Sequence, residues 1–391
     1  GGDTSCNATA MTDEITKITM PKWGPSMRKG TIVEWLVAEG SVIAMGDEIV
    51  EIETEKVNNG HEAPCSGLLR RHVASTGQVV PVGGLIGVVA PATVGEEEID
   101  SFIATFESAF VPEPPEDEVS APQTIETGGR VINYLDTGGA GTPMLLVHGI
   151  CADLESWMFN IPAIADARRV IAIDLPGHGA SSKDVGDGSP AFFVRCLGDF
   201  LTELGIDRAH LAGHSLGGAI AIAFALENPA RTASLGLIAP AGLGPEINGE
   251  LITRLIAADK RHSAQLALSQ LVADEELISH DMIEKFLRYK RTDGVPDALA
   301  TIAAASFDGD RQLNASADRI HEIKAPILCI WGEQDRIIPP SHVRSLPDHA
   351  AVHLLANTGH LPHMEMAPQV SALLATLATE SDRLDKAIAG T

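Results

Sequence analysis

The sequence predicts a multidomain chain, with a small all-β sandwich followed by a larger doubly wound α/β domain with a mostly parallel sheet. Three observations in its 391 residues point to this arrangement. A gapless internal repeat fills residues 12–90, and a stretch rich in proline and acid follows it. Over residues 129–380, short apolar runs then alternate with helical stretches, which is typical of a parallel sheet covered on both faces.

The first domain, residues 12–90, is predicted to consist of two copies of one structural unit. Tight turns favour glycine because it adopts positive φ without strain, and short strands at close spacing predict a small sandwich. The residues that recur in equivalent places are Gly30 and Gly67, Gly40 and Gly77, Val42 and Val79, Gly46 and Gly83, and Ile49 and Ile86. Residues 1–11 precede this domain, and we expect them to form an extension or a disordered segment.

Lys56 lies at the junction of the two copies, in a polar segment after a strand predicted at residues 48–52. Spacing alone allows an ordinary turn lysine. The surrounding motifs are more specific, because they resemble the lipoyl domains of 2-oxoacid-dehydrogenase-type acyltransferases. These motifs are Ile52-Glu53-Thr54-Glu55-Lys56-Val57, Met20-Pro21, Glu39-Gly40 and Gly46-Asp47. The resemblance implies a lipoyl/biotinyl-type sandwich in which lipoic acid is attached to Lys56 as N6-lipoyllysine.

Residues 91–128 read as an acidic, proline-rich linker, and residues 111–122 within it should be extended and semi-rigid. Apolar side chains at helical spacing predict a short amphipathic helix over residues 98–110. That helix either packs on a neighbouring domain or docks a partner subunit.

The second domain covers residues 129–380, and residues 381–391 read as a tail. Residues 245–318 interrupt the alternation with helical, polar sequence, which predicts an inserted helical cap. We expect helices at 192–204 and 218–227, and strands at 131–135, 144–147, 170–173, 209–212, 235–238, 327–330 and 352–355.

Ser215 lies in the motif Gly213-His214-Ser215-Leu216-Gly217, which follows a predicted strand and opens a predicted helix. This is the context of a nucleophile elbow. Asp335 and His360 each follow a later strand, so the order Ser, Asp, His predicts a nucleophile, an orienting acid and a base. Glu333 is a rival acid. His148-Gly149 ends another strand, and we expect the backbone N–H groups of Ile150 and Leu216 to form an oxyanion hole.

Residues 129–380 resemble the α/β-hydrolase family through these motifs. A lipoyl domain joined to such a domain resembles the dihydrolipoyllysine-residue acetyltransferase subunit of acetoin dehydrogenase complexes. The resemblance implies transfer of an acetyl group from lipoyl-Lys56 to coenzyme A at the Ser215, Asp335 and His360 site. It also implies two partners, the thiamine-diphosphate-dependent acetoin dehydrogenase subunits and dihydrolipoamide dehydrogenase. One departure is the segment Ile150-Cys151-Ala152, which lacks the expected additional glycines.

Two other functions stay open at this point. The chain is a serine thioesterase or esterase that its lipoyl domain recruits, or a carrier whose second domain is a scaffold. Basic residues of the predicted cap either meet the phosphates of coenzyme A or form a solvated helix face. They are Lys285, Arg288, Lys290 and Arg291.

Charge and composition exclude other classes of function. A net charge of −25 opposes binding to nucleic acid, because phosphate backbones repel an acidic chain. No apolar run is long enough to span a membrane, and no signal peptide is apparent, so we expect a cytoplasmic protein. The five cysteines form no zinc pattern, and we expect no metal site.

Overall fold

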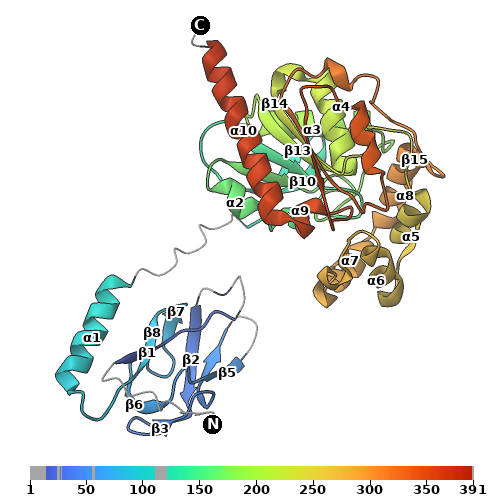
Figure 1. Cartoon of the computed structure of the whole chain (residues 1–391). Coiled ribbons are helices and arrows are strands. Elements are labelled where there is room, and N and C mark those ends of the chain that lie inside the picture. The colour runs from blue at the N-terminus through green and yellow to red at the C-terminus, as the bar shows by residue number, and fades with distance from the viewer. Residues whose placement is uncertain (1–14, 24–26, 28, 55–57, 111–120, 390–391) are drawn as a thin grey trace, which may run out of the picture. The chain divides into compact units, whose positions relative to one another are not determined.

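The computed structural model describes residues 15–23, 27, 29–54, 58–110 and 121–389, and the chain divides into two compact units, residues 1–118 and 119–391 (Figure 1). The predicted extension at residues 1–11 lies outside the described residues. Within them, no helix is long and apolar enough to cross a membrane.

The first unit is a sandwich of two four-stranded antiparallel sheets that share one apolar core. One sheet has the order β1 (Thr16–Thr19), β8 (Leu85–Val89), β6 (Gly67–His72) and β3 (Val42–Ile43). The other has the order β5 (Asn58–Glu62), β4 (Glu48–Glu53), β2 (Lys29–Trp35) and β7 (Val79–Pro81).

The internal repeat of the sequence is a structural symmetry of this sandwich. β2 pairs with β4 and β7, and its counterpart β6 pairs with β8 and β3. The equivalent turn residues Gly40 and Gly77 have φ of 85° and 83°. Trp35 and His72 are also equivalent, and their rings stack with centroids 4.0 Å apart. The two sequence copies therefore build the two halves of one domain, as predicted.

The predicted amphipathic helix is α1 (Glu96–Ala109), and it packs on the first unit. Its buried Ile99 joins an apolar cluster with residues of β8. Glu96 forms ion pairs with Arg70 and Arg71 at 2.5 and 2.6 Å. The interpretation of packing on a neighbouring domain is therefore confirmed, and the segment is an integral helix of the first unit. Residues 111–120 of the predicted extended stretch lie outside the described residues.

The second unit is built on a single eight-stranded sheet. In spatial order the strands are β18 (Ala351–Leu355), β17 (Ile327–Gly332), β14 (Thr232–Ile238), β13 (Ala209–His214), β11 (Met144–Val147), β12 (Val170–Ile173), β10 (Arg130–Asp136) and β9 (Gln123–Thr127). The six strands from β18 to β12 in this order pair in parallel, while β10 and β9 add an antiparallel edge.

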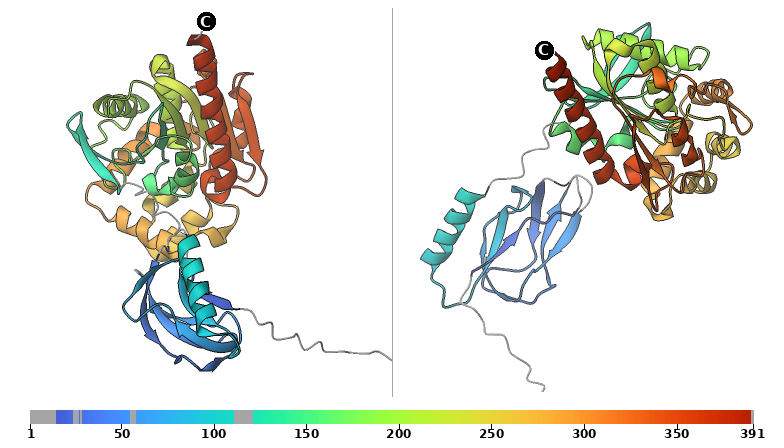
Figure 2. Two further views of the ribbon diagram at one scale, coloured as in Figure 1. Left: turned by 90° about the vertical axis from the view of Figure 1, so that its left-hand side faces the viewer. Right: turned by 45° about the horizontal axis from the view of Figure 1, so that its top comes forward.

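Helices cover both faces of this sheet, which explains why central strands such as β11 and β12 are apolar and buried along their whole length. On one face, side chains such as Leu145 pack with α3 (Pro190–Glu203) and α4 (Leu216–Glu227). On the other, Leu146 packs with α2 (Ile161–Ala165) and with α10 (Ala367–Ala389), the long helix seen on one side of the sheet in both views of Figure 2. The predicted cap contains α5 (Gly249–Ala257), α6 (Arg261–Ser269), α7 (His280–Lys290), α8 (Val295–Ser306) and the short strands β15 (Phe307–Asp308) and β16 (Arg311–Gln312).

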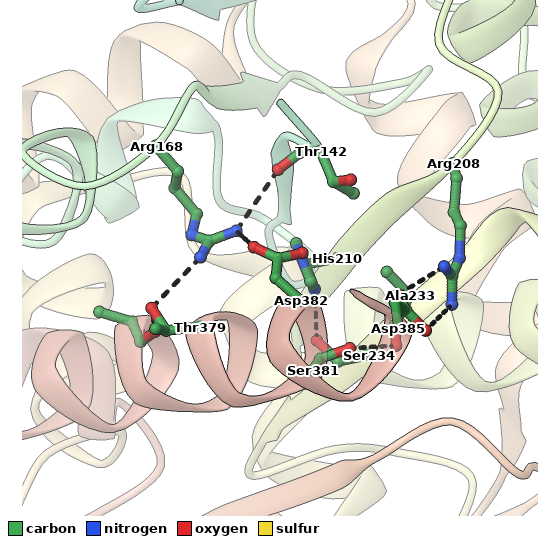
Figure 3. A network of polar contacts seen from close by, with 11 residues as sticks. Thr142, Arg168, Arg208, His210, Ala233, Ser234, Thr379, Ser381, Asp382 and Asp385 are labelled. Carbon is green, nitrogen blue, oxygen red and sulfur yellow. Dashed lines mark hydrogen bonds and ion pairs between the residues drawn. The ribbon is translucent and has the colours of Figure 1, made fainter. Parts of the chain in front are cut away.

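Two predicted boundaries of this unit were wrong. Residues 123–127 were assigned to the linker, but they form β9, which pairs along its whole length with β10. The predicted tail, residues 381–391, contains the last turns of α10. Asp382 explains this, since its carboxylate pairs with Arg168 at 3.1 Å and with His210 at 3.0 Å (Figure 3). These partners are distant in sequence, so no local pattern reveals that the helix continues.

Candidate active site

Ser215 sits at the sharp turn between β13 and α4, in the strand–turn–helix context that the motif predicts. Its φ of 50° and ψ of −115° lie outside the regions that side chains favour, so the backbone is strained there. A Cβ on Gly213 would lie 2.3 Å from the carbonyl oxygen of Gly217, and one on Gly217 would lie 2.2 Å from that of Val147. Glycine is therefore required on both sides of the serine.

His360 connects Ser215 to Asp335 through two hydrogen bonds. The imidazole Nδ1–H donates to Asp335 Oδ2 at 2.7 Å, and Nε2 accepts from the Ser215 hydroxyl at 3.0 Å. All three side chains are buried or nearly so. The structure thus brings together the three residues that the sequence assigned to catalysis, although they come from the ends of three different strands.

Each carboxylate oxygen of Asp335 accepts two hydrogen bonds, and these contacts hold the side chain in place. Oδ2 also accepts from Trp331 Nε1 at 2.9 Å, while Oδ1 accepts from the N–H groups of Ile337 and Ile338 at 2.8 and 3.0 Å. The rival acid Glu333 is exposed, and its backbone N–H bonds to Leu355. Asp335 is therefore the acid that faces His360.

Glu365, a residue that the sequence analysis missed, organises the loop that carries His360. Its carboxylate accepts from the N–H groups of Gly359, Leu361 and Ala273, at 2.8 to 3.1 Å. The backbone N–H of His360 itself donates to Leu271 at 2.7 Å. Ala273 and Leu271 belong to the cap, so the cap holds the histidine loop in place as well as covering the site. A glutamate in the short helix α9 (Pro362–Glu365) gives no sequence signal for this role.

The loop after β11 passes directly over Ser215. A Cβ on Gly149 would lie 3.2 Å from the Cβ of Ser215. Leu216 is the first residue of α4, and the first N–H groups of a helix have no acceptor within that helix. The N–H of Ile150 donates to no acceptor in the part of the chain that the structure describes. Neither N–H group is therefore committed to an acceptor within its own segment, and their role in an oxyanion hole stays a prediction.

Two more buried histidines lie near His360: the ring of His214 packs on that of His360, and the ring of His363 packs on that of His214. His214 Nε2–H donates to the carbonyl oxygen of His360 at 2.8 Å. Burial lowers the pKa of His363 to about 3, and burial also lowers the pKa of His214 well below its usual value. Both rings are therefore neutral near pH 7, as befits core residues.

Ser215 and His360 form part of the wall of a cavity of about 500 Å³ between the cap and the sheet. Its cap side is mainly apolar, with Leu255, Leu271 and Phe286 among the lining residues. Burial raises the pKa of Asp153, another lining residue, to about 7. The described residues contain no group of three side chains suited to hold a metal ion.

The four basic residues that the sequence analysis named in the cap differ in their surroundings. Lys290 is buried and donates to the carbonyl oxygens of Leu255 and Ile256, so it holds α5 and α7 together. Lys285 lines the cavity but pairs with Glu155 at 2.9 Å and with Asp281 at 3.3 Å. Arg288 and Arg291 are exposed.

Lys56 lies outside the described residues, but the strands on both sides of it are described. Glu53 at the end of β4 pairs with Asn58 at the start of β5. The connection between these two paired residues contains Lys56.

Comparisons with known proteins agree with this division of the chain. Residues 16–89 match the family described as biotin-requiring enzyme, and residues 142–367 match the alpha/beta hydrolase fold family. A meta-cleavage product hydrolase from Pseudomonas fluorescens IP01 superimposes with a TM-score of 0.61 at 24% identity, over 66% of this chain and 98% of that chain. At that identity the similarity establishes the fold alone.

Two relatives are similar over nearly the whole chain. The dihydrolipoyllysine-residue acetyltransferase component of acetoin cleaving system from Pseudomonas putida is 44% identical, covering 92% of this chain and 97% of the relative. The protein of the same name from Cupriavidus necator is 39% identical, covering 94% and 98%. A 2-hydroxy-6-oxo-6-phenylhexa-2,4-dienoate hydrolase from Burkholderia cepacia is 30% identical over 61% of this chain and 88% of its own. The chain, an enzyme with a lipoyl domain and an α/β-hydrolase domain, therefore belongs to the family of dihydrolipoyllysine-residue acetyltransferase components of acetoin cleaving systems.

Proposed function

We propose that this chain transfers an acetyl group from a lipoyl arm on Lys56 to coenzyme A, with Ser215, His360 and Asp335 as the catalytic residues. The observation that carries the proposal is the hydrogen-bonded series from Ser215 through His360 to Asp335 on the wall of a mainly apolar cavity. The same chain has a lipoyl-type domain, so the donor of the acetyl group travels with the enzyme.

The β4–β5 hairpin suits the attachment of a lipoyl group. Glu53 pairs with Asn58 across β4 and β5, so Lys56 belongs to the short sequence that connects these two strands. When bound, the lipoyl group supplies the thiol that carries the acetyl group. Tethering keeps this donor at an effective concentration in the millimolar range.

In the first half-reaction, the hydroxyl of Ser215 attacks the acetyl carbonyl carbon while His360 Nε2 takes its proton. Asp335 holds the imidazole in the required tautomer and stabilises its charged form. The N–H groups of Ile150 and Leu216 receive the oxyanion, at about 3–4 kcal/mol of transition-state stabilisation for each donor. The C–S bond then breaks, His360 gives the proton to the departing sulfur, and Ser215 is left as an acetyl ester.

The second half-reaction reverses these roles with coenzyme A. His360 removes the proton of the incoming thiol, the sulfur attacks the ester carbonyl, and the C–O bond to Ser215 breaks. The proton on His360 returns to the serine oxygen, so the site is regenerated. Water competes with the thiol at this step, and the apolar walls of the cavity oppose its entry.

The chemistry of the cycle also defines the partners that we propose. An enzyme that cleaves acetoin must load the arm, as expected of the thiamine-diphosphate-dependent acetoin dehydrogenase subunits. Dihydrolipoamide dehydrogenase must reoxidise the arm after the acetyl group has left. The relatives' names support membership of such a system, since they describe components of an acetoin cleaving system.

A second candidate function is hydrolysis, as in a serine thioesterase or esterase that its lipoyl domain recruits. It is favoured by the resemblance of the second unit to named hydrolases, one of them 30% identical over 256 residues. The two functions differ only in whether a thiol or water attacks the Ser215 ester.

Acetyl-dihydrolipoamide and coenzyme A distinguish these proposals. We expect acetyl-CoA to form faster than free acetate, and Ser215→Ala to abolish both products. Free acetate as the main product would favour the thioesterase, and unchanged acetyl-CoA formation by Ser215→Ala would exclude the acyl-enzyme route. Intact mass of the chain from a lipoate-competent host should show a lipoyl increment that Lys56→Arg removes.

A further inference from the structure

Two buried histidines outside the catalytic series lie beside the loop that passes over Ser215. His148 follows β11, and His178 lies in the loop after β12, the parallel neighbour of β11. Their rings meet edge to face, with centroids 4.9 Å apart, and neither ring is accessible to solvent.

Each histidine accepts a hydrogen bond from the loop that carries the other. His178 Nε2 accepts from the backbone N–H of Cys151 at 3.2 Å, and His148 Nε2 accepts from that of Leu175 at 3.0 Å. His178 Nδ1 lies 3.2 Å from the carbonyl oxygen of Pro176, and His148 Nδ1 lies 2.7 Å from that of Gly149. A carbonyl oxygen can only accept, so both rings carry their proton on Nδ1 and keep a lone pair on Nε2.

These contacts hold the two peptide units on either side of Ile150. The carbonyl of Gly149 and the N–H of Ile150 belong to one planar peptide group. The bond from His148 Nδ1 to Gly149 therefore orients the Ile150 N–H as well. The bond from His178 to Cys151 fixes the next peptide group along the chain.

Cys151 needs such support because its backbone is strained. Its φ of 60° is in the left-handed region, where glycine is the usual residue. The absence of additional glycines in this loop is thus compensated by hydrogen bonds that hold a side-chain-bearing residue in a glycine-like conformation.

We propose that His148 and His178 are positioning residues, which together hold the Ile150 N–H toward the oxyanion that forms at Ser215. This inference rests on the proposed function, in which Ser215 is acylated and Ile150 is an oxyanion donor. Burial lowers the pKa of both histidines, although the negative charge of Asp174 opposes this effect for His148. Both Nε2 atoms therefore remain acceptors near pH 7.

The test compares two substitutions of His178 in the full-length lipoylated chain, with acetyl-dihydrolipoamide and coenzyme A as substrates. His178→Phe keeps a ring but removes the acceptor for Cys151, whereas His178→Gln retains an acceptor oxygen. We expect His178→Phe to lower kcat about 10- to 100-fold with KM within threefold, because one preorganised oxyanion donor is misplaced. His178→Gln should retain most of the wild-type kcat.

A matched control is His210→Phe, which replaces another buried histidine at the opposite end of β13 and should leave kcat per folded molecule unchanged. A trifluoromethyl ketone that forms a tetrahedral oxyanion on Ser215 provides a second readout. Its affinity should fall in His178→Phe by the same factor as kcat/KM. A merely structural role would lower the amount of folded protein without this proportionality.

The wild-type chain gives a measurement that does not depend on folding of the variants. Spectra of protein labelled with ¹⁵N-histidine should show that the rings assigned to His148 and His178 are protonated on Nδ1 and do not titrate between pH 6 and 8. Wild-type kcat in His178→Phe, or a His178 ring protonated on Nε2, would overturn the inference. If Ser215→Ala retained activity, the proposed function would fail instead, which separates the two conclusions.

Discussion

Replacing Asp335 by asparagine removes a charge and leaves the shape of the side chain nearly unchanged. The carboxylate now accepts four hydrogen bonds, two on each oxygen, from His360 and Trp331 and from two backbone N–H groups. An amide has only one acceptor oxygen, so its NH₂ group must face two donors whichever way it points. If the NH₂ group faces His360, it donates to Nδ1 and so favours the tautomer that carries the proton on Nε2. That nitrogen then cannot accept a hydrogen bond from the Ser215 hydroxyl.

The expected loss of activity is large. When the wrong tautomer is imposed in serine proteases by the same change, kcat falls about 10⁴-fold, which corresponds to about 5.5 kcal/mol of activation free energy. If the amide instead turns its NH₂ toward the backbone N–H groups of Ile337 and Ile338, the unmet donors cost about 1–3 kcal/mol of folding free energy. We therefore expect a catalytic loss of about 10³- to 10⁴-fold together with a modest loss of stability.

The assay is acetyl-CoA formation from acetyl-dihydrolipoamide, with kcat and KM determined separately and the melting temperature measured alongside. Glu333→Gln is the matched control, because this nearby acid is exposed, and it should retain activity within about twofold. A loss of less than tenfold in Asp335→Asn, or a larger loss in Glu333→Gln, would refute the assignment of Asp335 as the orienting acid.

Three further predictions follow from other contacts. Glu365→Gln should lower kcat about tenfold and the free energy of unfolding by about 1–3 kcal/mol, because the amide has one acceptor oxygen for three backbone donors. Deleting residues 381–391 should reduce the free energy of unfolding by about 3–5 kcal/mol without changing kcat per folded molecule, since buried partners of Asp382 lose their acceptor. Stability should fall from pH 6.5 to 5, because burial lowers the pKa of His210 and His363 to about 4 and about 3, and the unfolded chain then binds more protons. Each group should contribute about 1.6 kcal/mol to that fall, and Asp153, whose pKa burial raises to about 7, should offset about 1.8 kcal/mol of the total.

Urea unfolding followed by circular dichroism measures the stability changes, and the acetyl-CoA assay measures kcat. Glu275→Gln and His349→Gln change exposed residues and serve as controls for the glutamate substitution and the pH dependence. A truncated chain as stable as the full one would contradict the role of Asp382. Equal free energies of unfolding at pH 7 and pH 5 would contradict the buried, neutral state of the two histidines.

Sequence patterns correctly predicted those elements whose structure depends on residues close together in the chain. The elbow glycines were correct because steric limits at a sharp turn act within a few residues of Ser215. The apolar strand at residues 144–147 was also correct, since burial on both faces requires it. β9 was missed because its alternation is short, and its assignment depends on pairing with β10.

The sequence by itself predicted the two domains, the repeat that forms the sandwich, and Ser215 and His360 as candidate catalytic residues, since each depends on a local motif or a period. Only the tertiary structure decided which acid faces His360, that Glu365 binds the histidine loop to the cap, and that two histidines support the loop over Ser215. Those contacts join segments far apart in the chain. Their geometry follows from packing of the sheet, the cap and α10, and a side chain's partner is fixed only when that packing is complete.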